Sequence, residues 1–164
     1  VQVKNEDGKG YLQNIVGIAA SGNSSYAMTK EGEVYSWGYN RYGQLGVNDG
    51  TTRLLPVKMK YVKNIMQMSG QDTAVALLDS DGSVWTVGYN GNYGLGIGND
   101  STIYTWSKMK NINGTAQMEN VKQIITNKNK RHKWKNTLQC KRSRFRKTTY
   151  SYIKRRWKCM GSRI

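Results

Sequence analysis

The stretch "VYSWGYNRYGQLG", Val34 to Gly46, returns fifty residues later as "VWTVGYNGNYGLG", Val84 to Gly96. A fixed spacing of this length indicates a repeated structural unit. Trp85 stands where the first copy has Tyr35, so an aromatic side chain recurs there too. Eleven positions recur without a slip: Gly32, Val34, Gly38, Tyr39, Asn40, Leu45, Gly46, Thr52, Lys58, Met59 and Lys60 correspond to Gly82, Val84, Gly88, Tyr89, Asn90, Leu95, Gly96, Thr102, Lys108, Met109 and Lys110.

Each copy has the pattern of a β-hairpin. The segment "SYAMTKEGEVYSWG" is an alternating apolar run, a turn with a glycine, and a second alternating run. The segment "AVALLDSDGSVWTVG" repeats this order, with Gly82 available for the positive φ of a tight turn. "IVGIAAS" and "YVKNIMQMS" predict one further strand ahead of each hairpin. The sequence has no sustained helical stripe of apolar residues, so we expect little helix.

Units of about fifty residues built from short strands predict the blades of a propeller. One small twisted sheet cannot bury both of its faces, and stacking against the next sheet supplies the missing contacts. We therefore predict an all-β fold, an incomplete β-propeller of about two four-stranded blades. The blades are expected over residues 12–60 and 61–125 of a repeat region 1–127, followed by a poorly ordered basic tail, residues 128–164.

The repeat resembles that of the regulator of chromosome condensation family, including bacterial proteins described as alpha-tubulin suppressor-like. The first copy fits the phrase G-x-V-[YW]-x-x-G-x-N-x-x-G-Q-L-G throughout, and the second departs from it at Tyr93 and Gly94. The similarity covers roughly residues 10–125. It implies a closed ring with more blades than this chain supplies, a noncatalytic protein-binding role, and a secreted or cell-surface location rather than the cytoplasm. For the intact parent propeller it also implies guanine nucleotide exchange as an alternative activity.

Almost all of the net charge of +16 lies at one end of the chain. Residues 1–127 hold eleven Lys and Arg against ten acidic residues, whereas residues 128–164 hold fifteen basic residues and no acidic residue. Basic residues in this tail are interleaved with aromatic ones such as Trp134 and Phe145, a composition that suits nonspecific binding to nucleic acid. No apolar run in the sequence is long enough to span a membrane.

A shifted reading frame is the favoured explanation of this tail. Moved by one base, Trp157 followed by Lys158 must read as glycine, and Met160 followed by Gly161 must read as tryptophan. Cys159 between them becomes valine or alanine. The shifted text therefore contains Gly-x-[Val/Ala]-Trp, which is the order found in the second blade. A tail that was not selected for packing is expected to stay poorly ordered.

Three patterns invite a chemical interpretation, and a structural one is favoured for each. "DSDGS", Asp79 to Ser83, has alternating acidic residues, but Val84 and Asn90 stand where a calcium loop needs glycine at its sixth position and glutamate at its twelfth, so a hairpin turn is expected. "GLGIG", Gly94 to Gly98, has no helix after it to bind a phosphate. His132, Cys140 and Cys159 lack the paired spacing of zinc ligands. We expect no catalytic residues, cofactor or metal, and therefore no enzyme.

The loops after the hairpins are the expected contact surface, because loops on a rigid scaffold commonly carry recognition. Arg41 and Tyr42 in the first loop, and Asn92 and Tyr93 in the second, are the candidate contacts with an unidentified protein partner. Open blade edges also favour self-association. The aromatic residues are expected to form blade core and inter-blade packing rather than a ligand cage: Tyr35, Trp37, Tyr39, Tyr42, Trp85, Tyr89 and Tyr93.

Overall fold

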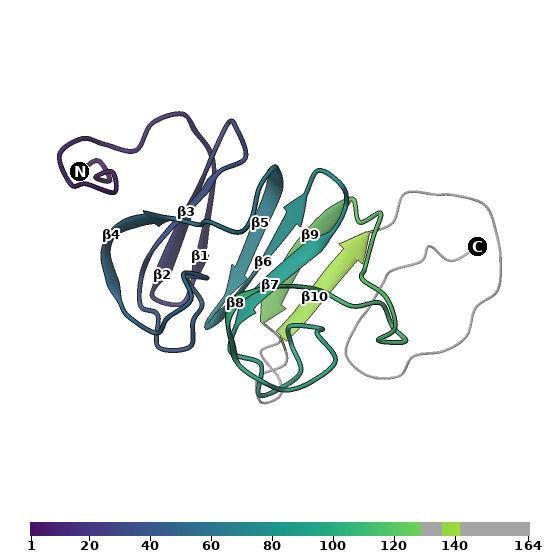
Figure 1. Ribbon diagram of the computed structural model, residues 1–164. Helices are drawn as coiled ribbons and strands as arrows, with labels where there is room; N and C mark the ends of the chain where they lie inside the picture. Colours follow the sequence, from purple (N-terminus) through teal and green to yellow (C-terminus); the bar gives the residue numbers. More distant parts are fainter. Residues whose placement is uncertain (129–135, 142–164) are drawn as a thin grey trace.

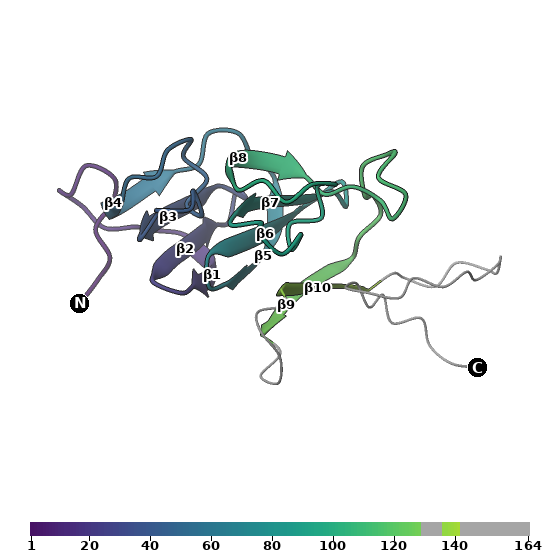
Figure 2. The ribbon, with the colours of Figure 1, turned by 90° about the horizontal axis from the view of Figure 1, so that it is seen from below.

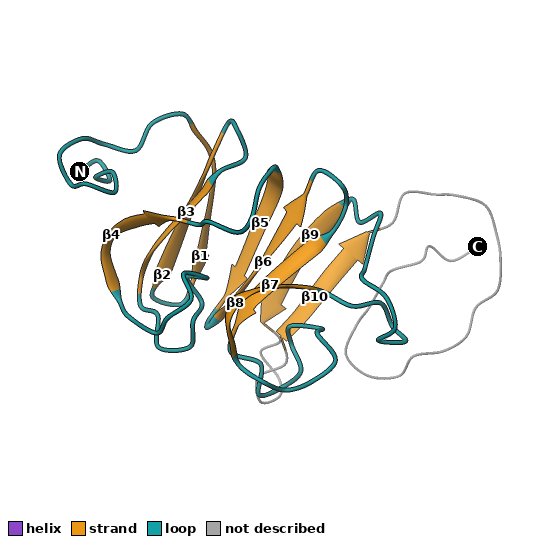
Figure 3. Ribbon diagram, in the orientation of Figure 1, coloured by secondary structure: helices purple, strands orange, loops and turns teal. Residues whose placement is uncertain are grey.

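The computed structural model describes residues 1–128 and 136–141, and these residues form strands and turns without a helix (Figure 3). The first sheet has the order β1-β2-β3-β4 and the second has the order β5-β6-β7-β8. The strands are β1 Ile15–Ser21, β2 Ser24–Thr29, β3 Val34–Gly38, β4 Arg53–Lys58, β5 Ile65–Gln71, β6 Ala74–Asp79, β7 Val84–Gly88 and β8 Ile103–Lys108. All neighbouring strands in both sheets are antiparallel. The prediction of an all-β fold with two four-stranded units is confirmed.

The hairpin turn between β6 and β7 is held by the carboxylate of Asp79. One oxygen accepts hydrogen bonds from the backbone N–H groups of Asp81 and Ser83, at 3.0 and 2.8 Å. The other accepts a 2.8 Å bond from the indole N–H of Trp85. Gly82 in this turn has a φ of 80°, as expected for a tight hairpin. The "DSDGS" segment is thus a hairpin turn, and the carboxylate of its first residue, Asp79, accepts hydrogen bonds from within the same hairpin.

Apolar side chains fill the joint between the two sheets, which stand side by side like consecutive blades (Figure 1). Figure 2 shows the first strands of the two sheets, β1 and β5, next to each other. The buried cluster in the joint contains Tyr26, Met28, Val34, Leu45 and Met59 from the first unit and Ile65, Val75, Leu77, Val87 and Trp106 from the second. Each sheet therefore buries one face against its neighbour, as the repeat predicts.

Similar apolar packing occurs on the other face of the second sheet, which points away from the first sheet. A second buried cluster contains Ala76, Leu78, Val84, Met109, Val121 and Ile124. Ile124 belongs to β9, Gln123–Lys128. The backbone N–H of Val121 donates to Gly82 at 3.0 Å, as that of Ile65 donates to Gly32 at 3.2 Å. The chain enters β9 as it enters β5, so β9 takes the place of the first strand of a third unit.

Strand β10, Asn136–Lys141, pairs antiparallel with β9. This pairing brings part of the predicted tail into a strand, which the sequence did not predict. Residues 129–135 and 142–164 lie outside the described residues. His132 and Cys159 lie in these ranges. Most of the tail for which poor order and nucleic-acid binding are predicted lies in them too. None of the described segments forms a helix that is long and apolar enough to cross a membrane.

Candidate partner-binding face

A buried asparagine anchors the loop that follows β3. The side-chain N–H of Asn40 donates to the backbone oxygen of Asp49 at 2.7 Å, and its oxygen accepts from the backbone N–H of Leu45 at 2.9 Å. Asn90 makes the same two bonds, at the same distances, with the residues fifty positions later. Both asparagines are fully buried. The repeated asparagine therefore fixes the loop backbone from within, which gives the loop a defined shape.

A hydroxyl group adds a second anchor to each loop. Ser36 of β3 donates to the backbone oxygen of Leu45 at 2.9 Å, and Thr86 of β7 donates to that of Leu95 at 2.9 Å. These two positions do not stand out as identical residues in the repeat, because serine in the first copy aligns with threonine in the second. A match by hydroxyl chemistry rather than by identity would have found them.

The first loop also docks on β8, the outer strand of the second sheet. Asn48 donates its backbone N–H to the oxygen of Tyr104 at 3.1 Å, and the hydroxyl of Tyr104 donates to the oxygen of Arg41 at 3.3 Å. A Cβ atom on Gly43 would lie 2.6 Å from the Cα of Tyr104, so only glycine allows this approach. Tyr93 holds the corresponding place in the second loop with a φ of 58°. Its side chain is 54% exposed.

Tyrosine side chains from the two loops meet where the sheets adjoin. The ring centroids of Tyr42 and Tyr89 are 5.3 Å apart, and the two ring planes are inclined by 65°. The ring centroids of Tyr39 and Tyr42 are 6.5 Å apart, with the planes inclined by 68°. These rings line a cleft of about 430 Å³, hereafter the tyrosine cleft. Its lining residues are Gly22, Asn23, Asp72 and Thr73 from the first hairpin turn of each sheet and Tyr39, Tyr42, Tyr89 and Asn92 from the loops.

The two hairpin turns hold the tyrosines of the cleft in place. The backbone N–H of Tyr39 donates to Asn23 at 3.0 Å, and that of Tyr89 donates to Thr73 at 2.9 Å. The turns themselves touch, because a Cβ atom on Gly22 would come within 2.4 Å of the backbone oxygen of Asp72. Backbone contacts between neighbouring turns thus set the distance across the cleft.

The structure brings together two of the four predicted contact residues. Tyr42 and Asn92 line the tyrosine cleft, whereas Arg41 and Tyr93 are exposed and lie outside its lining. The aromatic residues were expected to form blade core and inter-blade packing. Tyr89 does contact Tyr42 of the other unit, although it is 37% exposed, whereas Tyr93 is 54% exposed. They stand on loops rather than on the inward faces of strands. Asn23, Asp72 and Thr73 were not predicted as site residues. Their turns lie fifty residues apart in the structure, but the residue types in the two turns differ.

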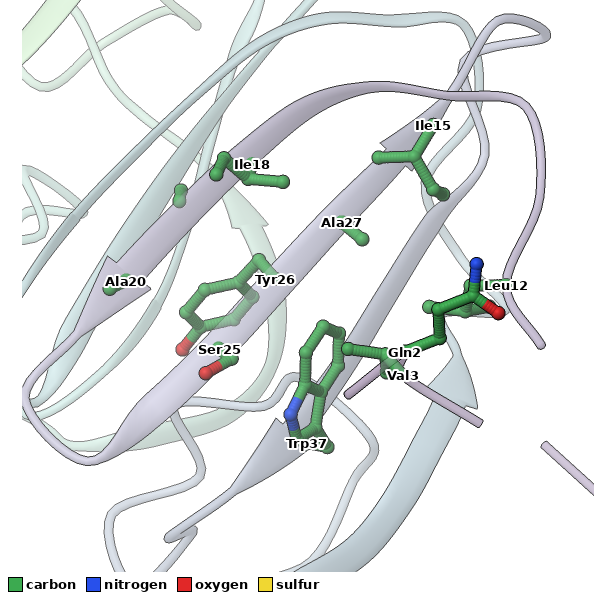
Figure 4. Close-up of a pocket in the computed structure, with 11 residues that line it drawn as sticks. Gln2, Val3, Leu12, Ile15, Ile18, Ala20, Ser25, Tyr26, Ala27 and Trp37 are labelled. Carbon is green, nitrogen blue, oxygen red and sulfur yellow. The ribbon is translucent and has the colours of Figure 1, made fainter. Parts of the chain in front are cut away.

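A second hollow, of about 670 Å³, lies on the open face of the first sheet. Figure 4 shows side chains from β1, β2 and β3 around it, together with residues of the N-terminal segment. Ser25, Ala27 and Trp37 line it. The residues fifty positions later, Val75, Leu77 and Val87, are buried in the joint between the sheets. This hollow is therefore the counterpart of a blade-packing surface, and the tyrosine cleft is the better candidate for a functional site.

The carboxylate of Asp49 links the first loop to the start of β4 and makes the stability of the fold sensitive to acid. Burial acts to raise the pKa of Asp49, but hydrogen bonds from Thr51 and Arg53 outweigh it and hold the pKa below its ordinary value of 3.8. A lowered pKa stabilises the fold above the unfolded-state value, and this stabilisation is lost as the pH falls through the folded-state value.

We expect Asp49→Asn to remove this acid sensitivity. The wild-type chain should have the higher urea midpoint at pH 6, and the difference should shrink towards zero as the pH falls below about 3.8. The side chain is 40% exposed, so the difference at pH 6 should stay below about 1 kcal/mol. Urea unfolding of both chains at several pH values measures it. A difference that stays constant from pH 6 to pH 3 would contradict this assignment.

Family models and relatives agree on the nature of the repeat. Two models of the regulator of chromosome condensation (RCC1) repeat match, over residues 15–44 and 31–77. A segment of 42 residues is 43% identical to the ultraviolet-B receptor UVR8 of Arabidopsis thaliana, and one of 54 residues is 39% identical to the probable E3 ubiquitin-protein ligase HERC4 of Homo sapiens. These matches cover 26% and 30% of this chain, but only 10% and 5% of those proteins.

Solved structures support the same fold. Human WBSCR16 is similar with a TM-score of 0.60 and 23% identity, over 70% of this chain and 30% of that one. Prp20p of Saccharomyces cerevisiae is similar with a TM-score of 0.58 and 22% identity, over 70% and 29%. The structure of Prp20p was described together with its binding properties to Gsp1p and histones, and yeast RCC1 (Prp20) has also been solved bound to Kap60. At these identities the similarity establishes the fold.

Proposed function

The chain is a repeat protein of the regulator of chromosome condensation type, and from this we propose that it is a noncatalytic scaffold that binds a partner protein across the tyrosine cleft. The observation that carries the proposal is the contact between loops of the two units, in which the ring centroids of Tyr42 and Tyr89 are 5.3 Å apart. Each loop is anchored by its buried asparagine. A partner would therefore meet a preformed surface, which lowers the entropy lost on binding.

The chemistry of the cleft supports binding rather than catalysis. Among the residues that the structure describes, the lining contains one carboxylate, Asp72, and no histidine, cysteine or lysine, so these residues offer no paired acid and base. Tyrosine is enriched in protein interfaces, because its ring adds apolar contact area while its hydroxyl forms hydrogen bonds. The similar protein Prp20p binds proteins, which favours the same class of role here.

Nucleic-acid binding through residues 128–164 is a second candidate function. It is favoured by fifteen basic residues without a single acidic one. Such binding depends on counterion release and weakens steeply with salt. Nuclease treatment and moderate salt therefore separate it from binding at the tyrosine cleft.

We expect the double variant Tyr42→Ala/Tyr89→Ala to lose its protein partner. Tagged full-length chain is used to capture proteins from nuclease-treated lysate at about 0.3 M salt, where nonspecific polyanion binding is weak. Truncating two aromatic anchors should weaken specific capture about thirtyfold, equal to about 2 kcal/mol. Quantitative mass spectrometry measures the amount of each captured protein.

Tyr61→Ala is the matched control, because Tyr61 is 64% exposed and lies outside the cleft lining. It should capture the same proteins as the wild-type chain. The proposal fails if every protein captured by the wild-type chain is captured equally by the double variant. Circular dichroism of both variants checks that the strands are retained.

A further inference from the structure

The connection from β8 to β9 is longer than the one that joins the first two units. Met109 and Asn120 mark its two ends and are 11 positions apart, whereas the matching residues Met59 and Asn64 are 5 positions apart. The second connection therefore carries six extra residues. Figure 2 shows them within a green loop that stands away from both sheets.

Hydrogen bonds close this loop at its base. Lys110 and Gln117 pair as an isolated antiparallel bridge. The backbone N–H of Asn111 donates to the backbone oxygen of Ala116 at 2.7 Å, and the side-chain oxygen of Asn111 accepts from the backbone N–H of Ala116 at 3.4 Å. Every residue from 112 to 117 is exposed. The base of the loop is thus held in place, while its tip lies in solvent.

The tip of the loop is an asparagine followed by a glycine, Asn113-Gly114. In such a pair the backbone nitrogen of the glycine can attack the side-chain carbonyl carbon of the asparagine, because no Cβ atom crowds the nitrogen. Among the described residues, none except the chain neighbours of Gly114 has an atom within 4 Å of a Cβ added there. The N–H of Gly114 donates to Asn111 at 2.9 Å, so the turn must open before the attack, and exposed turns open at little cost in free energy.

The sequence has one other Asn-Gly pair, Asn90-Gly91, and the fold protects it. The amide nitrogen of Asn90 donates to the backbone oxygen of Asn99 at 2.7 Å, and its oxygen accepts from the N–H of Leu95 at 2.9 Å. The side chain of Asn90 is fully buried. Turning it towards the nitrogen of Gly91 would break both bonds and leave the buried N–H of Leu95 without its acceptor. The same reaction is therefore suppressed at Asn90 while the chain stays folded.

We propose that Asn113 is a site of spontaneous covalent modification, at which a succinimide forms with Gly114 and is hydrolysed to aspartate or isoaspartate. The nitrogen of Gly114 bonds to Cγ of Asn113, the Cγ–Nδ2 bond breaks, and the amide group leaves as ammonia with the proton of the Gly114 N–H. Water then opens the ring. Opening at Cγ gives aspartate, whereas opening at the main-chain carbonyl carbon gives isoaspartate, whose backbone is longer by one methylene group. Either product adds a carboxylate to the loop, and neither depends on the proposed binding function.

The test is a time course of the full-length chain at mildly alkaline pH, where a larger fraction of the glycine nitrogen is deprotonated. Peptide mapping by mass spectrometry measures the conversion of each asparagine to aspartate and isoaspartate. In the folded chain we expect Asn113 to convert at least about tenfold faster than Asn90, which corresponds to about 1.4 kcal/mol of additional opening free energy at Asn90. In urea that unfolds the chain, the two pairs should convert at comparable rates.

Two variants assign the reaction to the tip of the loop. Asn113→Gln lengthens the side chain, so that its amide would have to close a less favourable six-membered ring. Gly114→Ala places a Cβ atom beside the attacking nitrogen. Conversion at the tip should fall in both variants to the rate measured at Asn99, which is exposed but precedes Asp100 rather than a glycine. Thermal unfolding checks that both variants keep the fold, as expected for substitutions at an exposed tip.

The proposal is overturned if Asn113 in the folded chain converts no faster than Asn90 or Asn99, or if Gly114→Ala leaves its conversion rate unchanged. A ratio between Asn113 and Asn90 that is the same in urea as in the folded chain would also count against it. Such a ratio would arise from the neighbouring residues in the sequence, and the protection of Asn90 by the fold would be refuted.

Discussion

The substitution Gly88→Ala is expected to lower the free energy of unfolding by about 4 kcal/mol. Gly88 ends β7 with a φ of 111°, a conformation that residues with a side chain rarely adopt. A Cβ atom there would lie 2.2 Å from the backbone oxygen of Thr73. The neighbour is backbone rather than a flexible side chain, so strands β6 and β7 must separate to make room. Urea unfolding followed by circular dichroism measures the loss.

Gly114→Ala is the matched control for this prediction. Gly114 also has a positive φ, 68°, but among the described residues none except its chain neighbours has an atom within 4 Å of an added Cβ. Its substitution carries the conformational cost alone, about 1 kcal/mol. If the two variants are equally stable, the close contact with Thr73 is not important for the fold. A Gly88→Ala chain that does not fold at all, beside a folded Gly114→Ala chain, agrees with the prediction.

Removing the buried amide in Asn40→Ala is expected to cost about 3 kcal/mol of stability. The substitution leaves the N–H of Leu45 and the backbone oxygen of Asp49 without their partner. Leu45 is fully buried, so water cannot reach its N–H group without opening the loop. A buried polar group that loses its only hydrogen bond carries its full desolvation cost. The loop that bears Tyr42 should loosen as well, and partner capture should fall.

Asn99→Ala provides the comparison for this amide. Asn99 is exposed, and its side chain accepts one bond, from the backbone N–H of Ser101. Its loss should cost less than about 1 kcal/mol. Hydrogen exchange of the Leu45 amide should accelerate in Asn40→Ala and stay unchanged in Asn99→Ala. Equal unfolding free energies for the two variants would contradict the role assigned to Asn40.

Most of the fold was predictable because its determinants are local. The alternating runs and glycine turns encode each hairpin within about fifteen residues. The repeated Gly38, Asn40, Gly88 and Asn90 mark the positions where a bulge ends a strand and an amide anchors the following loop. The start of a third unit escaped prediction because its spacing changes. Asn64 and Asn120 hold the same positive φ ahead of β5 and β9, yet they are 56 residues apart.

The candidate site was only half predictable. The loops were identified as a contact surface, and two of the four chosen residues, Tyr42 and Asn92, do line the tyrosine cleft. Asp72 and the hairpin turns were not anticipated, because turn chemistry explains their residue types without any ligand. The prediction of inter-blade packing holds for Tyr89, but the sequence does not show that its ring also remains partly exposed on the surface.

Strand pattern, repeat length and turn residues follow from the order of amino acids alone, since each depends on the backbone preferences of a few consecutive residues. The tyrosine cleft does not, because its walls come from residues about fifty positions apart. Those walls are joined only when the turn at Gly22 packs on the turn at Asp72. The apolar joint sets the angle and distance between the neighbouring sheets. This placement brings equivalent loops of the two repeats together, and they form one surface for a partner.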